Sequence, residues 1–104
     1  MNFKKFTVKS QEAIEKASQL AQEKGNQAID VSHLLKGVFD VSDSVTSYLF
    51  GKLGVNYKNV VALCNQLVDS QPKVSGGEPY LSREVNNVLQ KSVALATKID
   101  ARFL

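Results

Sequence analysis

IDVSHLLKG, residues 29–37, contains the only histidine of the 104-residue chain, His33. A catalytic histidine needs a nucleophile and an orienting acid, and a metal site needs several ligands. A single cysteine, the distant Cys64, is the one further candidate for such a group, and it cannot complete either kind of site. Asp30 instead predicts a helix N-cap, with His33 at the third helical position, where its imidazole hydrogen-bonds back to the capping turn as a glutamate does in a capping box. We therefore predict that His33 is a structural residue.

Apolar residues recur at three- and four-residue steps on both sides of this stretch, which predicts helices nearly throughout. The expected N-caps are Thr7, Asp30, Ser42 or Asp43, Asn56 and Ser82, with stops at Gly25 and Gly51–Gly54. The apolar positions expected on the five helices are Ala13, Ile14, Ala17, Leu20 and Ala21; Val31, Leu34, Leu35, Val38 and Phe39; Val45, Tyr48 and Leu49; Tyr57, Val60, Val61, Cys64, Leu67 and Val68; and Val85, Val88, Leu89, Leu95, Ala96 and Ile99. No alternating strand pattern of useful length is present, so the sequence predicts an all-α domain.

Length, charge and cysteine content restrict the class of protein. A chain of 104 residues, 43% hydrophobic and 22% charged, fits one globular domain. Its net charge of +3 comes from lysines and arginines in runs no longer than two, so we expect no nucleic-acid partner. Cys64 has no partner cysteine, which favours a reducing compartment. Without a signal peptide or a membrane-length apolar run, the expected location is cytoplasmic.

The polar stretch DSQPKVSGGEP, residues 69–79, separates two similar segments. Its GGEP lacks the Lys-Ser/Thr of a phosphate-binding loop, so we interpret SGGE as a flexible joint. Residues 6–29 align without a gap on residues 81–104 at an offset of 75, which places Thr7 on Ser82 and makes caps and apolar positions coincide. The expected organisation is a first repeat at 1–69, a linker at 70–80 and a truncated second repeat at 81–104.

Three strings carry a family resemblance: FTVKSQEAIEKASQLAQEKGNQAIDVSHLLKGVF (6–39), LGVN (53–56) and PKVSGGEPYLSREVNNVLQKS (72–92). They resemble the N-terminal domain of Clp-type AAA+ unfoldases, most closely that of ClpB-type disaggregases. The resemblance implies duplicated four-helix units, here one complete unit plus the first helix of the second, in a fragment of a longer chain. It also implies binding of unfolded or aggregated polypeptide and its delivery to a ring, in which other modules of the parent chain use ATP and Mg²⁺.

For the parent chain, the resemblance further implies a hexamer that works with a co-chaperone system. The alternative within the same family is a ClpA- or ClpC-like domain that docks adaptors or substrates for a protease-associated unfoldase. In either case we expect no enzymatic activity from these 104 residues, and we assign them no catalytic, cofactor-binding or metal-binding residue.

The resemblance also suggests polypeptide-binding residues. The family has a functionally important threonine where this chain has Thr7, although Thr7 also fits an N-cap. The family's acidic residue in the second repeat has Asp100 as its nearest candidate, one position before the aligned Ala101. The apolar residues at the starts of the two repeats are equally compatible with a binding groove and with ordinary core; they are Phe3, Phe6, Val8, Tyr80 and Leu81.

The apolar face of helix 82–99 would be only half covered in such a fragment. We therefore expect this helix either to fold back on the first repeat or to pair with a second copy of the chain about a two-fold axis.

Overall fold

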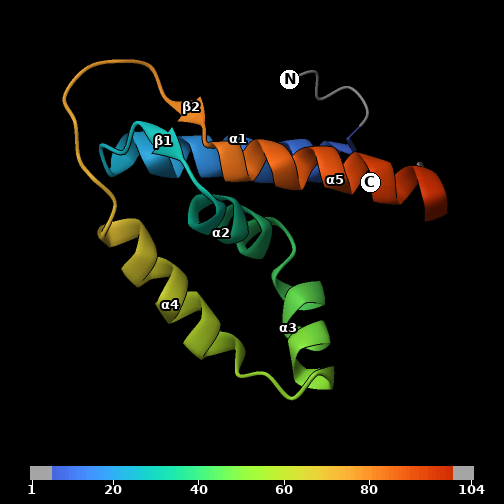
Figure 1. The fold of residues 1–104 in the computed structure, drawn as a ribbon. Coiled ribbons are helices and arrows are strands. Elements are labelled where there is room, and N and C mark those ends of the chain that lie inside the picture. The colour runs from blue at the N-terminus through green and yellow to red at the C-terminus, as the bar shows by residue number, and fades with distance from the viewer. Residues whose placement is uncertain (1–5, 100–104) are drawn as a thin grey trace.

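The computed structural model describes residues 6–99, which form five helices and two very short strands (Figure 1). The helices are α1 (Val8–Glu23), α2 (Val31–Val41), α3 (Asp43–Lys52), α4 (Tyr57–Asp69) and α5 (Arg83–Ile99), and the strands are β1 (Ala28–Ile29) and β2 (Tyr80–Leu81). The prediction of an all-α domain is confirmed.

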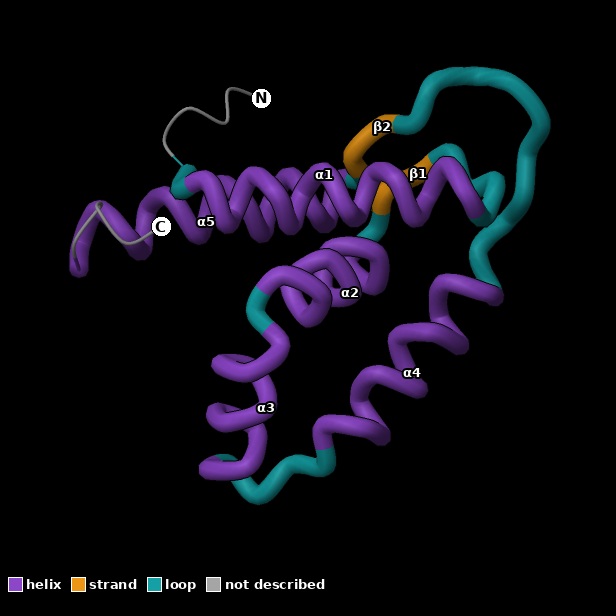
Figure 2. The backbone as a smooth tube through the Cα atoms, turned by 180° about the vertical axis from the view of Figure 1, so that it is seen from behind, coloured by secondary structure: helices purple, strands orange, loops and turns teal. Residues whose placement is uncertain are grey.

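Helices α1 and α5 run in opposite directions and pack through a core cluster of Phe6, Ile14, Val85 and Leu89 (Figure 1). Helix α2 crosses beneath this pair, and α3 continues from it. A loop joins the far end of α3 to α4, which packs against α2 and leads back toward β2 (Figure 2). Helix α5 therefore folds back on the first repeat, one of the two arrangements expected for it. Its pairing with a second copy stays a prediction.

The helices begin where the cap residues predict. Thr7 accepts a hydrogen bond from the Ser10 backbone N–H at 3.1 Å, and Asn56 accepts one from the Asn59 N–H at 3.1 Å. Ser42 precedes α3 without a side-chain cap; instead, its carbonyl accepts the Thr46 hydroxyl at 2.8 Å. The Thr7 and Asn56 bonds satisfy backbone N–H groups that a helix N-terminus otherwise leaves without partners.

The two strands form a parallel pair that the sequence did not predict. Ala28 lies opposite Tyr80 and Ile29 opposite Leu81, with N–H···O bonds from Tyr80 to Gln27 and from Ser82 to Ile29, each 2.9 Å. A two-residue strand is too short to show alternation in sequence. The pair brings the segment before α2 alongside the segment before α5.

The buried face of α2 differs from the prediction. Phe39 is buried as predicted, but Leu35 and Val38, also expected inside, are partly exposed. Ser32, His33 and Gly37 are buried as well. The cause is a close approach to α1 at Gly37: a Cβ there would overlap the Ala13 carbonyl oxygen. At this crossing point α2 contacts α1 through a glycine, which an apolar periodicity cannot reveal.

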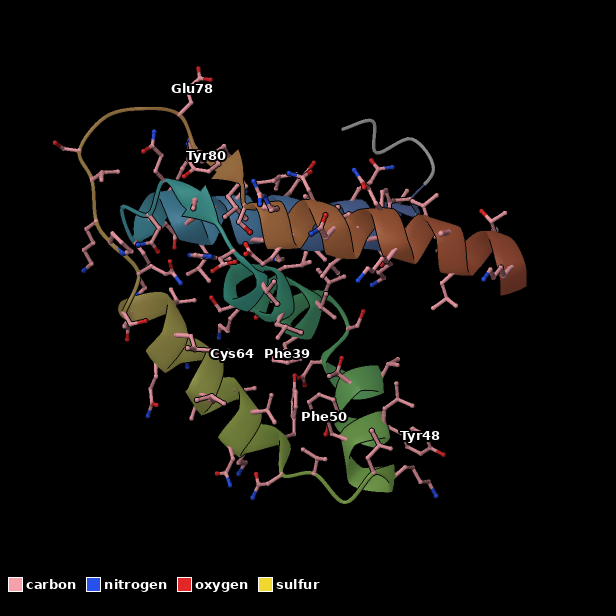
Figure 3. All side chains as sticks on the ribbon, in the orientation of Figure 1. Phe39, Tyr48, Phe50, Cys64, Glu78 and Tyr80 are labelled. Atoms are coloured by element: carbon pink, nitrogen blue, oxygen red, sulfur yellow. The ribbon has the colours of Figure 1, made fainter. Side chains whose placement is uncertain are left out.

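Other predicted apolar stripes are also only partly covered. On α3 the three predicted residues are exposed, and Figure 3 shows Tyr48 pointing away from the rest of the molecule. On α4, Cys64 and Val68 are buried while Leu67 is exposed, and on α5 Val85 and Leu89 are buried while Val88 and Leu95 are exposed. Edge-to-face contacts join the rings of Phe39 on α2, Phe50 on α3 and Tyr57 on α4, with centroids 5.3–6.0 Å apart.

Replacing Gly37 with alanine tests the α1–α2 contact. The added methyl group should force the helices apart and lower the free energy of unfolding by about 1–3 kcal/mol, despite alanine's better helix propensity. Gly51 is a matched control, because a Cβ on this α3 glycine has no neighbour within 4 Å. Gly51→Ala should be neutral or stabilising by about 0.5–1 kcal/mol. Urea unfolding of both variants measures this, and equal stabilities would contradict the close approach.

Candidate functional site

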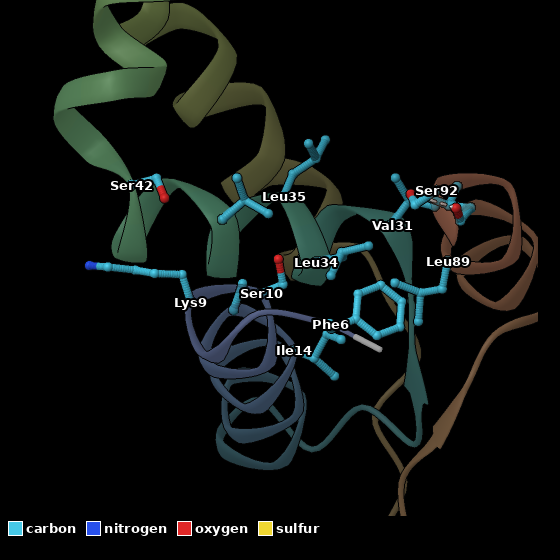
Figure 4. A pocket seen from close by; sticks show the side chains of 13 residues that line it. Phe6, Lys9, Ser10, Ile14, Val31, Leu34, Leu35, Ser42, Leu89 and Ser92 are labelled. Atoms are coloured by element: carbon cyan, nitrogen blue, oxygen red, sulfur yellow. Dashed lines mark hydrogen bonds between the residues drawn. The ribbon is translucent and has the colours of Figure 1, made fainter. Parts of the chain in front are cut away.

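An apolar groove of about 310 Å³ lies between α1, α2 and α5 (Figure 4). The Phe6 ring lies beside Ile14, Leu34 and Leu89, so part of the core cluster forms the wall of the groove. Lys9 is the only charged side chain among the described residues that line it. The residues that line the groove are Phe6, Lys9, Ser10, Ala13, Ile14, Val31, Leu34, Leu35, Val38, Ser42, Val88, Leu89 and Ser92.

Three of the predicted binding residues lie at the start of α1, next to this groove. Phe6 is buried and lines it. Thr7 is half-buried and is the N-cap of α1; its hydroxyl accepts the Ser10 N–H and donates to the Ser10 Oγ at 3.1 Å. Val8 is 72% exposed and does not line the groove. The cap interpretation of Thr7 is therefore confirmed, whereas a contact with a bound polypeptide is untested.

Two more of the predicted residues, Tyr80 and Leu81, do not line the groove. Tyr80, 56% exposed, and the half-buried Leu81 pair with β1, which follows the C-terminal end of α1. Leu81 also packs against the core cluster that contains Phe6. Phe3 and Asp100 lie outside the described residues.

His33 has the predicted structural role, within a hydrogen-bond network that holds α2. Its side chain is fully buried, and its Nδ1 accepts the Asp30 backbone N–H at 2.9 Å, which completes a capping box. An accepting Nδ1 leaves the proton on Nε2, which donates to the Asn26 Oδ1 at 2.9 Å. Both ring nitrogens are thus occupied, which excludes a free base or metal ligand here.

The same network reaches the linker and α5. The Asp30 carboxylate accepts the Val31 N–H at 2.9 Å and the Ser82 hydroxyl at 3.0 Å, and its other oxygen accepts the Gln71 side chain at 3.4 Å. Asn26 is buried, and its amide donates to the Pro72 carbonyl at 3.1 Å. Sequence reasoning missed Asn26 and Gln71, since a polar residue after a helix stop indicates only a turn. Ser82 was predicted as a cap, but not as a partner of Asp30.

Burial changes the acid–base behaviour of His33 and Cys64. Desolvation lowers the pKa of His33, although the Asp30 charge and the backbone hydrogen bond from Asp30 act in the opposite direction. Desolvation raises the pKa of the Cys64 thiol against the smaller effect of the Lys36 charge. A raised pKa disfavours the reactive thiolate, in agreement with the prediction that Cys64 is a buried apolar residue.

Two features are absent from residues 6–99. No group of three or more His, Cys, Asp or Glu side chains there could hold a metal ion. Within the same range, no helix is long and apolar enough to cross a membrane.

The sequence matches the family described as the Clp repeat (R) N-terminal domain over residues 5–104. The chain belongs to the Clp N-terminal domain family. It is 48% identical over 104 residues to the chaperone protein ClpB of Bacteroides thetaiotaomicron and 42% identical to that of Porphyromonas gingivalis. These matches cover the whole chain but only 12% of each relative, so this Clp N-terminal domain corresponds to a small part of the ClpB chaperones. The chaperone protein ClpB of Corynebacterium efficiens is 34% identical over 101 residues.

The lowered pKa of His33 predicts a pH-dependent stability of this Clp N-terminal domain. In the unfolded chain the imidazole titrates near its ordinary pKa of about 6.5, whereas the folded chain resists its protonation. Stability should therefore be complete above about pH 7 and fall as the pH drops through about 6.5 toward the lower folded pKa. His33→Gln does not titrate, and its amide oxygen can still accept the Asp30 N–H as in other capping boxes.

Urea midpoints for the parent and His33→Gln between about pH 7.5 and 5.5 test this prediction. The variant should be less stable at neutral pH and should lose less stability on acidification. Parallel pH profiles would show that His33 does not carry the effect.

Proposed function

We propose that this chain is the N-terminal domain of a ClpB-like ATP-dependent disaggregase, where it binds unfolded or aggregated polypeptide and passes it to the AAA+ ring. Family membership and the names of the relatives support the chaperone assignment. The observation that carries the binding role is the groove between α1, α2 and α5, whose lining is apolar apart from Lys9 and three serines.

The groove has the properties that recognition of unfolded chains needs. Unfolded and aggregated proteins differ from folded ones in their exposed apolar side chains, and an apolar groove gains free energy by covering them, about 25 cal/mol per Å². Leu35, Val38 and Val88 are partly exposed along it, and hydrogen-bonding groups that would require a defined sequence are few. Such a surface favours apolar segments of many sequences over one small ligand.

Within this proposal, Phe6 contributes to the wall of the groove and Thr7 lies at its end. Val8 extends the apolar surface outside it, and Tyr80 adds an exposed side chain at β2, next to Leu81, which packs against the core cluster that contains Phe6. Asp100 keeps its proposed role as the acid of the second repeat.

In this proposal the catalytic activity belongs to other modules of the parent chain. We propose that the parent chain carries AAA+ modules that bind ATP and Mg²⁺, that it assembles as a cytoplasmic hexamer, and that it acts with a co-chaperone system. The domain itself would be non-catalytic, and its contribution to disaggregation would be the capture of clients.

Binding of fluorescently labelled unfolded casein tests the proposed function. Val38→Lys places a charge inside the groove at a partly exposed position and should weaken binding about tenfold, the effect of losing roughly 1.4 kcal/mol. Leu63→Lys is the matched control, because this α4 leucine is also exposed but lies outside the groove. Equal affinities of both variants and the parent, each with an unchanged circular dichroism spectrum, would contradict binding at the groove.

A further inference from the structure

Helix α3 presents an apolar stripe to solvent. Val45, Tyr48, Leu49 and Leu53 occupy positions i, i+3, i+4 and i+8, which place side chains on one face of a helix, with Leu53 as the C-cap residue. These four side chains are 52–72% exposed. Lys52, at position i+7 of the same face, is exposed as well. We call these five residues the α3 stripe; contiguous exposed apolar surface of this kind marks sites of interaction.

The opposite side of α3 anchors the helix. The Phe50 ring packs edge-to-face on Phe39 and Tyr57, with centroids 6.0 and 5.5 Å away, and the Tyr57 hydroxyl donates to the Asp43 carboxylate at 2.9 Å. Figure 3 shows Phe50 pointing toward Phe39 and Tyr48 pointing the other way. Turning α3 to bury its stripe would break these contacts. The stripe is therefore a preformed surface on an anchored helix.

The part of the chain that carries the stripe has positive charges and no negative ones. From Ser44 to Val68 the sequence contains no aspartate or glutamate, and its only charged residues are Lys52 and Lys58, although the whole chain has 10 acidic residues. The nearest acids in sequence are Asp40 and Asp43, and Asp43 is held on the anchored side of α3 by its hydrogen bond. A partner that covers the stripe consequently meets lysines at its edge.

One of these lysines is held over the stripe itself. Lys52 Nζ lies 5.5 Å from the centroid of the Tyr48 ring, within the range of a cation–π interaction. This contact orders a side chain that would otherwise be flexible, so less conformational entropy is lost when its ammonium group pairs with a carboxylate. The end of the stripe is thus prepared for a negatively charged group.

An acidic partner helix fits these features better than a second copy of the chain or a lipid surface. Two stripes packed together would bring lysines of like charge together, which is unfavourable. Recognition of an anionic lipid surface uses clusters of roughly four to eight lysines and arginines, whereas residues 44–68 contain two. An amphipathic helix with acidic flanks covers the apolar side chains and also pairs with the lysines.

We propose that the α3 stripe docks an acidic amphipathic helix of a partner protein, packed alongside α3. Helix α3 has 10 residues and is roughly 15 Å long at 1.5 Å per residue, so about three turns of the partner helix cover it. Tyr48 and Leu49 lie at the centre of the contact, and Lys52 pairs with a carboxylate at its end. None of the stripe residues lines the groove between α1, α2 and α5, so this docking surface is separate from the proposed client site.

A designed peptide is the probe. It is fluorescein-labelled, about 16 residues long, with leucine at three- and four-residue steps and with glutamate and glutamine at the other positions. Titration with the 104-residue chain at low salt should give saturable binding, seen as fluorescence anisotropy, that weakens as salt is added. Two control peptides should bind much less well: one with lysine in place of glutamate, and one with the same composition but leucines distributed around the helix.

Variants of the stripe locate the bound peptide. Tyr48→Ser should weaken binding about tenfold, whereas Leu95→Ser, at a similarly exposed position on α5, should leave it unchanged. Lys52→Glu should weaken binding about fivefold at low salt, whereas Lys16→Glu makes the same change in net charge at an exposed position on α1 and should have little effect. All four positions are exposed, so the circular dichroism spectra should match that of the parent.

Several results would overturn the proposal. Absence of saturable binding, or equal binding of the lysine peptide, would remove the charge complementarity on which it rests. Parent-like binding by both Tyr48→Ser and Lys52→Glu would place the peptide elsewhere, and loss of binding in Val38→Lys would place it in the groove.

Two further measurements test the other occupants of the stripe. Sedimentation with vesicles of equal phosphatidylcholine and phosphatidylserine content should leave the chain in solution, and binding that Lys52→Glu abolishes would assign the stripe to a lipid surface. Analytical ultracentrifugation should give the same association state for the parent and Tyr48→Ser. Self-association that Tyr48→Ser abolishes would assign the stripe to a second copy of the chain.

Discussion

The Asp30 carboxylate is the point on which the arrangement of the helices depends. It accepts hydrogen bonds from the start of α2, from the linker at Gln71 and from the start of α5 at Ser82. The His33 side chain accepts the Asp30 backbone N–H in the same turn and donates to the Asn26 side chain. The Asn26 amide in turn donates to the Pro72 carbonyl in the linker. Segments more than 40 residues apart in sequence are therefore positioned by one buried polar network. Removing one member would leave other buried groups without partners, at about 1–3 kcal/mol for each group.

The groove is a consequence of this network. With β1 held against β2 and α2 held beneath α1, Leu35 and Val38 stay partly exposed and line the groove together with residues of α1 and α5. The close contact at Gly37 sets the distance between α2 and α1. The core cluster around Phe6 holds α5 against α1. An apolar surface suited to client polypeptide thus arises from polar contacts at its edge.

Local signals in the sequence predicted the helix starts and the role of His33 correctly. Caps and the capping box depend on residues within three positions of one another, so the chain sequence contains all the information they need. The 75-residue repeat likewise required only a comparison of the sequence with itself. Predictions of which residues are buried were less accurate, because burial depends on which elements pack against a helix. The buried face of α2 was misassigned in part because Gly37 packs against α1 and Ser32 is buried, and a hydrophobic periodicity assigns such residues to the surface.

Long-range polar contacts were the other feature that the sequence could not reveal. Asn26 and Gln71 look like ordinary turn residues until the fold brings them to His33 and Asp30. The same holds for the binding residues: Phe6 was predicted from its position at the start of the first repeat, but the contribution of α2 and α5 to the groove required the packing of three helices. Tyr80 and Leu81 have the same kind of position in sequence, but they pair with β1 and do not line the groove.

A double-mutant cycle between Asp30 and Ser82 is the most direct measurement of the central claim, that one carboxylate joins the two helix starts. Asp30→Ala, Ser82→Ala and the double variant each lose a cap, and the cycle removes those individual costs from the comparison. The network predicts a coupling free energy of about 0.5–3 kcal/mol in urea unfolding. Additive effects, within about 0.3–0.5 kcal/mol, would show that α2 and α5 are positioned independently and would contradict the account.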